Sequence, residues 1–296
     1  MIVENIKLTY GQCTAEVQLK GAQIVSFKAA DGREVIWQGD PNVWAQHAPV
    51  LFPICGSVKD NQIIIDGQTY PMNKHGFTRN PIFQVAKQGE DFVELILTPT
   101  EESKPMYPFD FVFHVTYTLI ENGFTTTFLV ENRSDRVMPF CVGGHPAFVC
   151  PMEEGAAFSD YQLVFPQVEE GRNSLAPGGG LIEGYEFLPE FHNSDTLPLR
   201  HELFDSHDAL IFTTLKSRSV KLVHKGSGKG IHFAFPKMEV LAVWTMPNKH
   251  ADYVCLEPWH GMPAQTSESG RFEDKPFVTL LQPGQCYKTW FTATLI

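Results

Sequence analysis

The alternation of apolar and polar residues constrains the fold of this chain most strongly. Over residues 111–119 every second side chain is a large apolar one, the turn-forming Glu121-Asn122-Gly123 follows, and a similar alternation continues over 124–130. A two-residue period puts all the apolar side chains on one face of a strand, and Asn-Gly is a favoured hairpin turn. The pattern predicts a β-hairpin with one buried face.

Similar signals recur along the chain. Turn-forming residues at Asp31-Gly32, Asp66-Gly67 and Gly89-Glu90-Asp91 separate short alternating segments and predict further hairpins. Almost no segment shows sustained apolar spacing at the helical period of 3.6 residues, so we predict an all-β fold.

Continuous apolar runs mark a second kind of strand. Residues 240–244 and 277–281 are apolar along almost their whole length, which predicts strands covered on both faces. Only short helical turns are expected, near 41–47 and 202–208.

The segment 152–199 bears on the domain organisation. It is rich in Gly, Pro, Glu and Asn, and it could be a linker between two domains or a long insertion in one. Hairpin-like runs and candidate site residues lie on both sides of it. We therefore predict a single domain over residues 1–296.

Composition excludes several classes of function. Hydrophobic residues make up 43% and charged residues 19% of the 296 residues, as in an ordinary globular protein, and the net charge is −11. Binding to nucleic acid or anionic membrane relies on clustered Lys and Arg, which are missing here, so neither is expected as a partner. No apolar stretch approaches the roughly 18 residues that suggest a membrane span.

The chain start and the cysteines favour a cytoplasmic location. Residues 1–6 lack the basic and apolar regions of a signal peptide. The six cysteines include no Cys-x-x-Cys pair, which predicts free buried thiols in a reducing compartment. Cys255 is interpreted as a small apolar strand residue rather than a nucleophile.

Two histidines and a glutamate occupy similar surroundings. His75, His145 and Glu257 each lie against Gly or Pro and close to an aromatic residue, where a strand-like run gives way to a turn. Catalytic groups tend to lie on such loops at strand ends, and imidazole with carboxylate forms an acid–base set near neutral pH. From spacing alone, His145 could equally be a buried core histidine; the alternatives for His75 and Glu257 are a turn histidine and a solvated strand-end carboxylate.

Four motifs in order resemble those of the aldose 1-epimerase (galactose mutarotase-like) family. They are Leu51-Phe52-Pro53, His75-Gly76-Phe77-Thr78-Arg79, Gly144-His145-Pro146 and Glu257-Pro258-Trp259. The match is closest to the LacX and hexose-6-phosphate mutarotase-like branch and extends over nearly the whole chain. The resemblance implies a large twisted antiparallel β-sandwich with its site on one concave sheet.

The resemblance also implies an activity and its residues. The family interconverts the α and β anomers of an aldose by opening the ring, with a base at the anomeric hydroxyl and an acid at the ring oxygen. His145 and Glu257 match that acid and base, on either side of a pyranose, and neither cofactor nor metal is required. The expected ligand is a sugar or sugar phosphate. The sequence leaves open whether the protein forms a homodimer.

The binding residues follow from the same motifs. His75 matches a histidine that hydrogen-bonds the sugar near its ring oxygen, and Arg79 could grip a hydroxyl or an anionic group or form a surface ion pair. Asp208 resembles the family's hydroxyl-binding aspartate, with Asp205 as a rival. Trp259 is expected to stack on the sugar.

Two more aromatics are candidates for stacking on the sugar. Phe77 belongs to the second motif, and Trp244 lies in the apolar run 240–244. A place in such a run predicts that Trp244 belongs to the core instead.

One position departs from the family pattern. Ser57 stands where an arginine is expected after the first motif, and a neutral hydroxyl cannot pair bidentately with a phosphate. Lys59 is a candidate to compensate. The sequence therefore leaves open which sugar is bound and whether it is phosphorylated.

Other functions remain as alternatives. A non-catalytic carbohydrate-binding protein on the same fold would use the aromatics and Asp208 without needing an acid–base pair. A glycoside hydrolase would need two carboxylates, and only Glu257 lies in a motif. The eleven histidines form neither His-x-His nor His-Glu-x-x-His, so no metal site is predicted.

Overall fold

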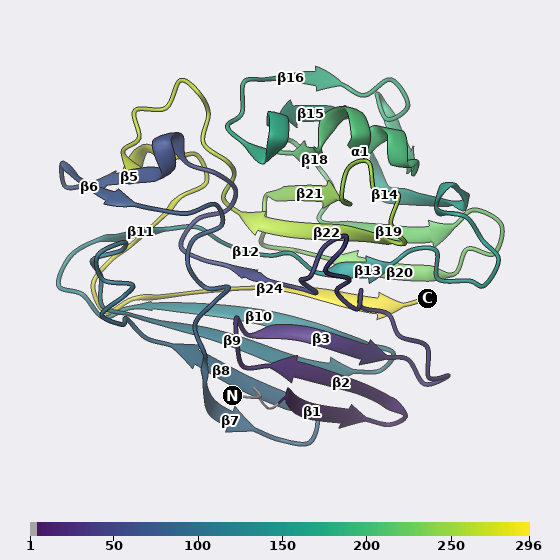
Figure 1. Cartoon of the computed structure of the whole chain (residues 1–296), viewed down its shortest axis with the longest axis horizontal. Helices are drawn as coiled ribbons and strands as arrows, with labels where there is room; N and C mark the ends of the chain where they lie inside the picture. The colour runs from purple at the N-terminus through teal and green to yellow at the C-terminus, as the bar shows by residue number, and fades with distance from the viewer. Residues whose placement is uncertain (1–4) are drawn as a thin grey trace.

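The computed structural model describes residues 5–296, and residues 1–4, used above to judge a signal peptide, lie outside the described part. Antiparallel sheets form the framework of the structure, which confirms the predicted all-β class (Figure 1). One α-helix is present among the described residues, α1 (His201–His207), where a helical turn was expected. Segment 41–47 forms turns without a helix. No helix in residues 5–296 combines the length and apolarity that crossing a membrane requires.

The larger sheet has nine strands in the order β17-β14-β19-β20-β24-β10-β9-β8-β7. The predicted hairpin at its centre is confirmed, because Ile120 lies opposite Gly123 and Phe111 opposite Asn132. The strands are β7 (Gln84–Gln88), β8 (Phe92–Leu97), β9 (Phe111–Ile120), β10 (Gly123–Asn132), β14 (Tyr161–Glu169), β17 (Ser194–Pro198), β19 (Ser219–His224), β20 (Gly230–Ala234) and β24 (Cys286–Leu295).

A second sheet has the order β18-β21-β22-β12-β4, with β13 also paired to β22. The central strand of this sheet, β22, is buried at every position except its last residue, because strands flank both of its edges and other parts of the protein cover both of its faces. The strands are β4 (Val50–Leu51), β12 (Val142–Gly144), β13 (Ala147–Val149), β18 (Ala209–Phe212), β21 (Val240–Trp244) and β22 (Tyr253–His260).

Smaller sheets complete the fold. They are β1 (Asn5–Tyr10), β2 (Cys13–Gln18) and β3 (Gln23–Lys28); β5 (Gln62–Ile65) with β6 (Gln68–Pro71); β11 (Met138–Phe140) with β23 (Thr279–Leu281); and β15 (Arg172–Leu175) with β16 (Gly184–Phe187). The predicted turns at 66–67 and 89–91 close the β5–β6 and β7–β8 hairpins. The turn at 31–32 instead closes an isolated bridge between Lys28 and Glu34.

One strand prediction is wrong in part. The apolar run 277–281 forms only the three-residue β23, in which Leu280 is 46% exposed. Leu281 is buried while Leu280 is exposed, so only one face of this strand, which pairs with β11 alone, is covered.

The two large sheets face each other across a core rich in phenylalanine (Figure 1). Phe52, beside β4, stacks on Phe113 of β9 with ring centroids 4.7 Å apart, which joins the two sheets. Segment 152–199 supplies β14 and β17 to the nine-stranded sheet, so it is not an extended linker. All six cysteines are free and five are buried as predicted, but Cys286 is exposed.

Candidate active site

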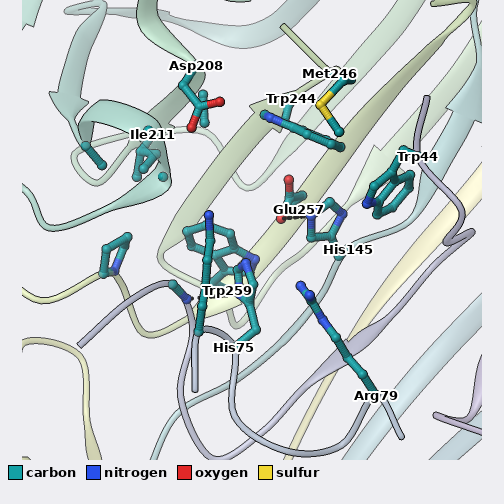
Figure 2. Close-up of a pocket in the computed structure, with 17 residues that line it drawn as sticks. Trp44, His75, Arg79, His145, Asp208, Ile211, Trp244, Met246, Glu257 and Trp259 are labelled. Carbon is teal, nitrogen blue, oxygen red and sulfur yellow. Dashed lines mark hydrogen bonds and ion pairs between the residues drawn. The ribbon is translucent and has the colours of Figure 1, made fainter. Parts of the chain in front are cut away.

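A cavity lies against the six-stranded sheet and gathers the residues of the sequence motifs (Figure 2). Its walls come from β18, β21, β22, the β12–β13 connection, the end of α1 and loops around residues 44, 56, 74–79, 176–179, 246 and 263. Lining residues include Trp44, Gly56, Lys74, His75, Arg79, His145, Gly178, Gly179, Asp208, Trp244, Met246, Glu257 and Trp259.

Glycine and a left-handed turn hold His75 in the wall. Gly76 has φ +78°, and a Cβ there would lie 1.9 Å from the carbonyl oxygen of Phe52, so only glycine fits. His75 itself has φ +66°. Its backbone N–H donates to the Gly56 carbonyl at 2.9 Å, and the Gly56 N–H donates back to His75 Nδ1 at 3.0 Å.

That second bond fixes the state of the ring. Because Nδ1 accepts a hydrogen bond, the proton of neutral His75 lies on Nε2. Burial and the nearby Arg79 charge lower the pKa of His75 well below its usual value. His75 is therefore a neutral hydrogen-bond donor.

His145 and Glu257 lie side by side at the floor of the cavity (Figure 2). Glu257 is in β22 opposite Ala242 of β21, and His145 lies in the connection between β12 and β13, which both pair with β22. His145 Nε2 is 3.2 Å from Glu257 Oε2, and the two residues are 6% and 2% exposed. The indole of Trp44 stacks on the imidazole with centroids 5.0 Å apart.

Burial sets the electrostatics of this pair. It raises the pKa of Glu257 well above its usual value, against the opposing charges of Lys74 and Arg79. It lowers the pKa of His145 well below its usual value, and Arg79 adds to that shift. Both shifts disfavour the charged forms, so they narrow the free-energy gap between the ion pair and the neutral pair.

Several buried polar atoms of the cavity residues are without hydrogen-bond partners in the described part of the chain. They are Arg79 Nε, His145 Nδ1, Trp259 Nε1 and Glu257 Oε2, the last of which lies 3.2 Å from His145 Nε2 as an ion pair without hydrogen-bond geometry. Buried polar groups are nearly always paired in proteins. These atoms are therefore free to hydrogen-bond a polar molecule that enters the cavity.

Asp208 lines the cavity at a distance from the His145–Glu257 pair (Figure 2). It follows α1 with φ +63° and ψ −74°, a strained conformation held by its N–H donating to the Phe204 carbonyl at 2.8 Å. The carboxylate of Asp205 instead accepts from the Asn248 N–H at 2.6 Å and pairs with His250 at 2.9 Å. Asp208 is thus the aspartate available to a ligand.

Lys74 places a cation beside Asp208. A Cβ on Gly179 would lie 2.0 Å from Lys74 Nζ and 3.2 Å from Asp208 Oδ2, so both groups approach the glycine backbone. The Ser57 hydroxyl is occupied, because it donates to the Gly179 carbonyl at 2.8 Å. Lys59 is exposed and outside the cavity, so the expectation that it compensates for the missing arginine is wrong.

The structure brings six predicted site residues into one cavity: His75, Arg79, His145, Asp208, Glu257 and Trp259. The acid and base candidates are in contact, so the expectation that they lie on either side of the sugar is wrong.

Two aromatic assignments are wrong. Trp244, predicted as core, lines the cavity edge-on to His145 at 5.6 Å, because the last residue of β21 is only half-buried. Phe77 packs in the core against Phe52 at 6.1 Å instead of facing a sugar.

Sequence reasoning missed Trp44, Lys74 and Met246 as cavity residues. Lys74 directly precedes His75 in a motif, which is a signal that could have identified it. Trp44 and Met246 lie in turn segments without such a signal.

Comparisons with known proteins show the family of the chain. Residues 4–279 match the model of the aldose 1-epimerase family. The chain is 36% identical over 299 residues to Protein LacX of Lactococcus lactis subsp. lactis, covering 99% of each chain.

Solved structures show the same fold. A galactose mutarotase related enzyme from Lactobacillus acidophilus superimposes with a TM-score of 0.92 at 30% identity, over 99% of this chain and 97% of that one. A galactose mutarotase-like protein from Lactobacillus casei ATCC 334 gives 0.91 at 27% identity, over 99% and 100%. The architecture is therefore the galactose mutarotase-like β-fold, and the chain belongs to the aldose 1-epimerase family.

Proposed function

We propose that the protein is an aldose mutarotase that interconverts the α and β anomers of a hexose or hexose phosphate. The observation that carries this proposal is the contact between His145 and Glu257 in a buried cavity. Their separation of 3.2 Å suits a substrate whose two reacting oxygens share one carbon.

Ring opening requires two proton movements at the anomeric centre. Glu257 takes the proton of the anomeric hydroxyl while His145 gives one to the ring oxygen, and the bond from that oxygen to the anomeric carbon breaks. The aldehyde turns about one bond, and the reverse transfers close the ring as the other anomer. Because the two oxygens are attached to the same carbon, the acid and the base must be neighbours.

Burial suits the pair to this reaction. Opening converts the imidazolium and carboxylate into imidazole and carboxylic acid, and closing restores them. The buried site disfavours the charged forms of both groups, so forming the neutral pair on ring opening costs little free energy. The pair returns to its starting state after each turnover without a cofactor.

The other groups bind and orient the sugar. The Nε2–H of His75 donates to a sugar oxygen near the anomeric centre, and Asp208 accepts hydrogen bonds from hydroxyls at the far end. Arg79 opposes the effect of burial on Glu257 and so favours its ionised, basic form. The tryptophans supply apolar walls.

The charges bear on substrate choice. Lys74 at the Asp208 end offers a cation to a phosphorylated sugar, whereas Asp208 beside it favours hydroxyls. Both hexoses and hexose phosphates therefore belong in the test.

The experiment is polarimetry with freshly dissolved α-glucose, α-galactose and glucose 6-phosphate, comparing the approach to anomeric equilibrium with and without protein. We expect at least one sugar to equilibrate faster in proportion to protein concentration. If sugars bind but none equilibrates faster than the uncatalysed control, the protein is a non-catalytic carbohydrate-binding member of the family.

A further inference from the structure

A buried thiol lies beside the acid–base pair. Cys255 precedes Glu257 by two positions in β22, so the two side chains leave the strand on the same face. Its sulfur, a ring nitrogen of His145 and a carboxylate oxygen of Glu257 all lie within 4.8 Å of one another. Proton transfer to and from a sugar does not use this thiol.

These three donors suit a zinc-like ion. Thiolate sulfur, imidazole nitrogen and carboxylate oxygen are the ligands that Zn²⁺ takes, and three protein ligands with one open position form a common zinc arrangement. Ligand bonds of about 2.0–2.3 Å put donors about 3.3–3.8 Å apart on a tetrahedral ion. Donors within 4.8 Å of one another would have to approach by up to about 1–1.5 Å to reach that geometry.

A second observation points to a ligand at this place. Glu257 Oε2 is buried and has no hydrogen-bond partner among the described residues, since its ion-pair contact with His145 Nε2 at 3.2 Å lacks hydrogen-bond geometry. Both residues line the cavity, which gives an ion a path from solvent and space for a water as fourth ligand.

We propose that Cys255, His145 and Glu257 form a binding site for a thiophilic divalent cation such as Zn²⁺, and that the bound ion inhibits the protein. As the ion binds, the Cys255 thiol loses its proton to solvent and a sulfur–metal bond forms. The ion then occupies lone pairs of His145 and Glu257 that proton transfer requires. The inhibitory part rests on the proposed mutarotase function; the binding part does not.

Hard cations should not compete for this site. Mg²⁺ and Ca²⁺ prefer all-oxygen ligands, and only one of the three donors is oxygen. Zinc inhibition should therefore persist in excess magnesium.

Binding is tested without any sugar by titrating the protein with Co²⁺, whose bond to a thiolate gives a near-ultraviolet charge-transfer band. We expect the band in the wild type and its loss in Cys255→Ser. Cys286→Ser is the matched control, because Cys286 is the exposed cysteine and could bind cobalt at the surface; this variant should keep the band. A zinc-soaked wild-type crystal adds a test that needs no variant, with an anomalous peak expected at ligand distance from all three side chains.

Activity supplies the second arm. Each variant's zinc sensitivity is compared with its own zinc-free rate, and Cys255→Ser should need a higher zinc concentration for half inhibition. The shift should be about tenfold or more, since even hydrogen-bonding partners of metal ligands are worth about 10–100-fold in affinity.

The outcomes separate the two proposals. A Cys255-dependent cobalt band without mutarotase activity would support the metal site and refute the proposed mutarotase function. Normal mutarotation with neither band nor zinc inhibition removes the metal site alone. A band that survives Cys255→Ser, or a zinc peak elsewhere, overturns the assignment. Loss of activity on chelation would make the ion a requirement of the reaction and overturn its inhibitory role.

Discussion

Three variants test whether His145 and Glu257 act as one catalytic unit: Glu257→Gln, His145→Asn and the double variant. General acid or base catalysis contributes about 10²–10⁴-fold, so each single change should slow turnover by about 100-fold or more. Independent groups would multiply to a loss of about 10⁴-fold or more. The 3.2 Å contact predicts instead a double variant scarcely slower than either single one, because the acid cannot act without the base.

The expected coupling follows from these factors. If the second change costs nothing after the first, the two positions are coupled by at least about 2.7 kcal/mol, since each tenfold in rate is about 1.36 kcal/mol. Glu257→Gln should not lower the melting temperature. Burial raises the pKa of Glu257, so an uncharged isostere is tolerated at this position.

The assay measures anomer interconversion and sugar binding separately. Binding is followed by tryptophan fluorescence, because Trp44, Trp244 and Trp259 line the cavity. Glu239→Gln and His260→Asn are matched controls, since that pair lies at 2.6 Å outside the cavity and should leave turnover unchanged. Losses that multiply in the double variant would refute the reasoning. Loss of sugar binding in Glu257→Gln would make that residue a binding group.

Two further variants test binding and folding. Asp208→Asn should raise KM more than it lowers kcat, because Asp208 binds hydroxyls without moving protons. Asp205→Asn is the control and should leave KM unchanged, since Asp205 pairs with His250. Equal effects of the two variants on KM would contradict the assignment. Gly76→Ala should lower the free energy of unfolding by well over the about 1–2 kcal/mol expected for a left-handed backbone alone, because the new Cβ would clash with Phe52. Gly67 has a similar φ but open space around it, so Gly67→Ala should cost only about 1–2 kcal/mol in denaturant titrations. Equal costs for the two variants would refute the steric argument.

Local patterns explain what the sequence could predict. The β9–β10 hairpin follows from alternation and an Asn-Gly turn within about twenty residues, and both signals act locally. The motif residues His75, His145 and Glu257 were identified because glycine and proline beside them report turns at strand ends. Resemblance to a family supplied their roles.

Long-range pairing explains what the sequence could not predict. His145 reaches Glu257 because β12 and β13 pair with β22, a register between segments over one hundred positions apart that no local pattern specifies. Trp244 shows a related limit: an apolar run has the same pattern whether its last residue faces the core or a cavity. Trp44 reaches the site from a loop without any periodic signal.

Exchange spectroscopy at anomeric equilibrium tests the central claim most directly. The rate of magnetisation transfer between the α and β anomeric proton signals of each test sugar is measured with wild-type protein, Glu257→Gln and Glu239→Gln. The account predicts exchange proportional to wild-type and Glu239→Gln concentration, and a loss of about 100-fold or more in Glu257→Gln with binding retained. Exchange at the uncatalysed rate for every sugar that saturates the wild-type cavity would contradict it.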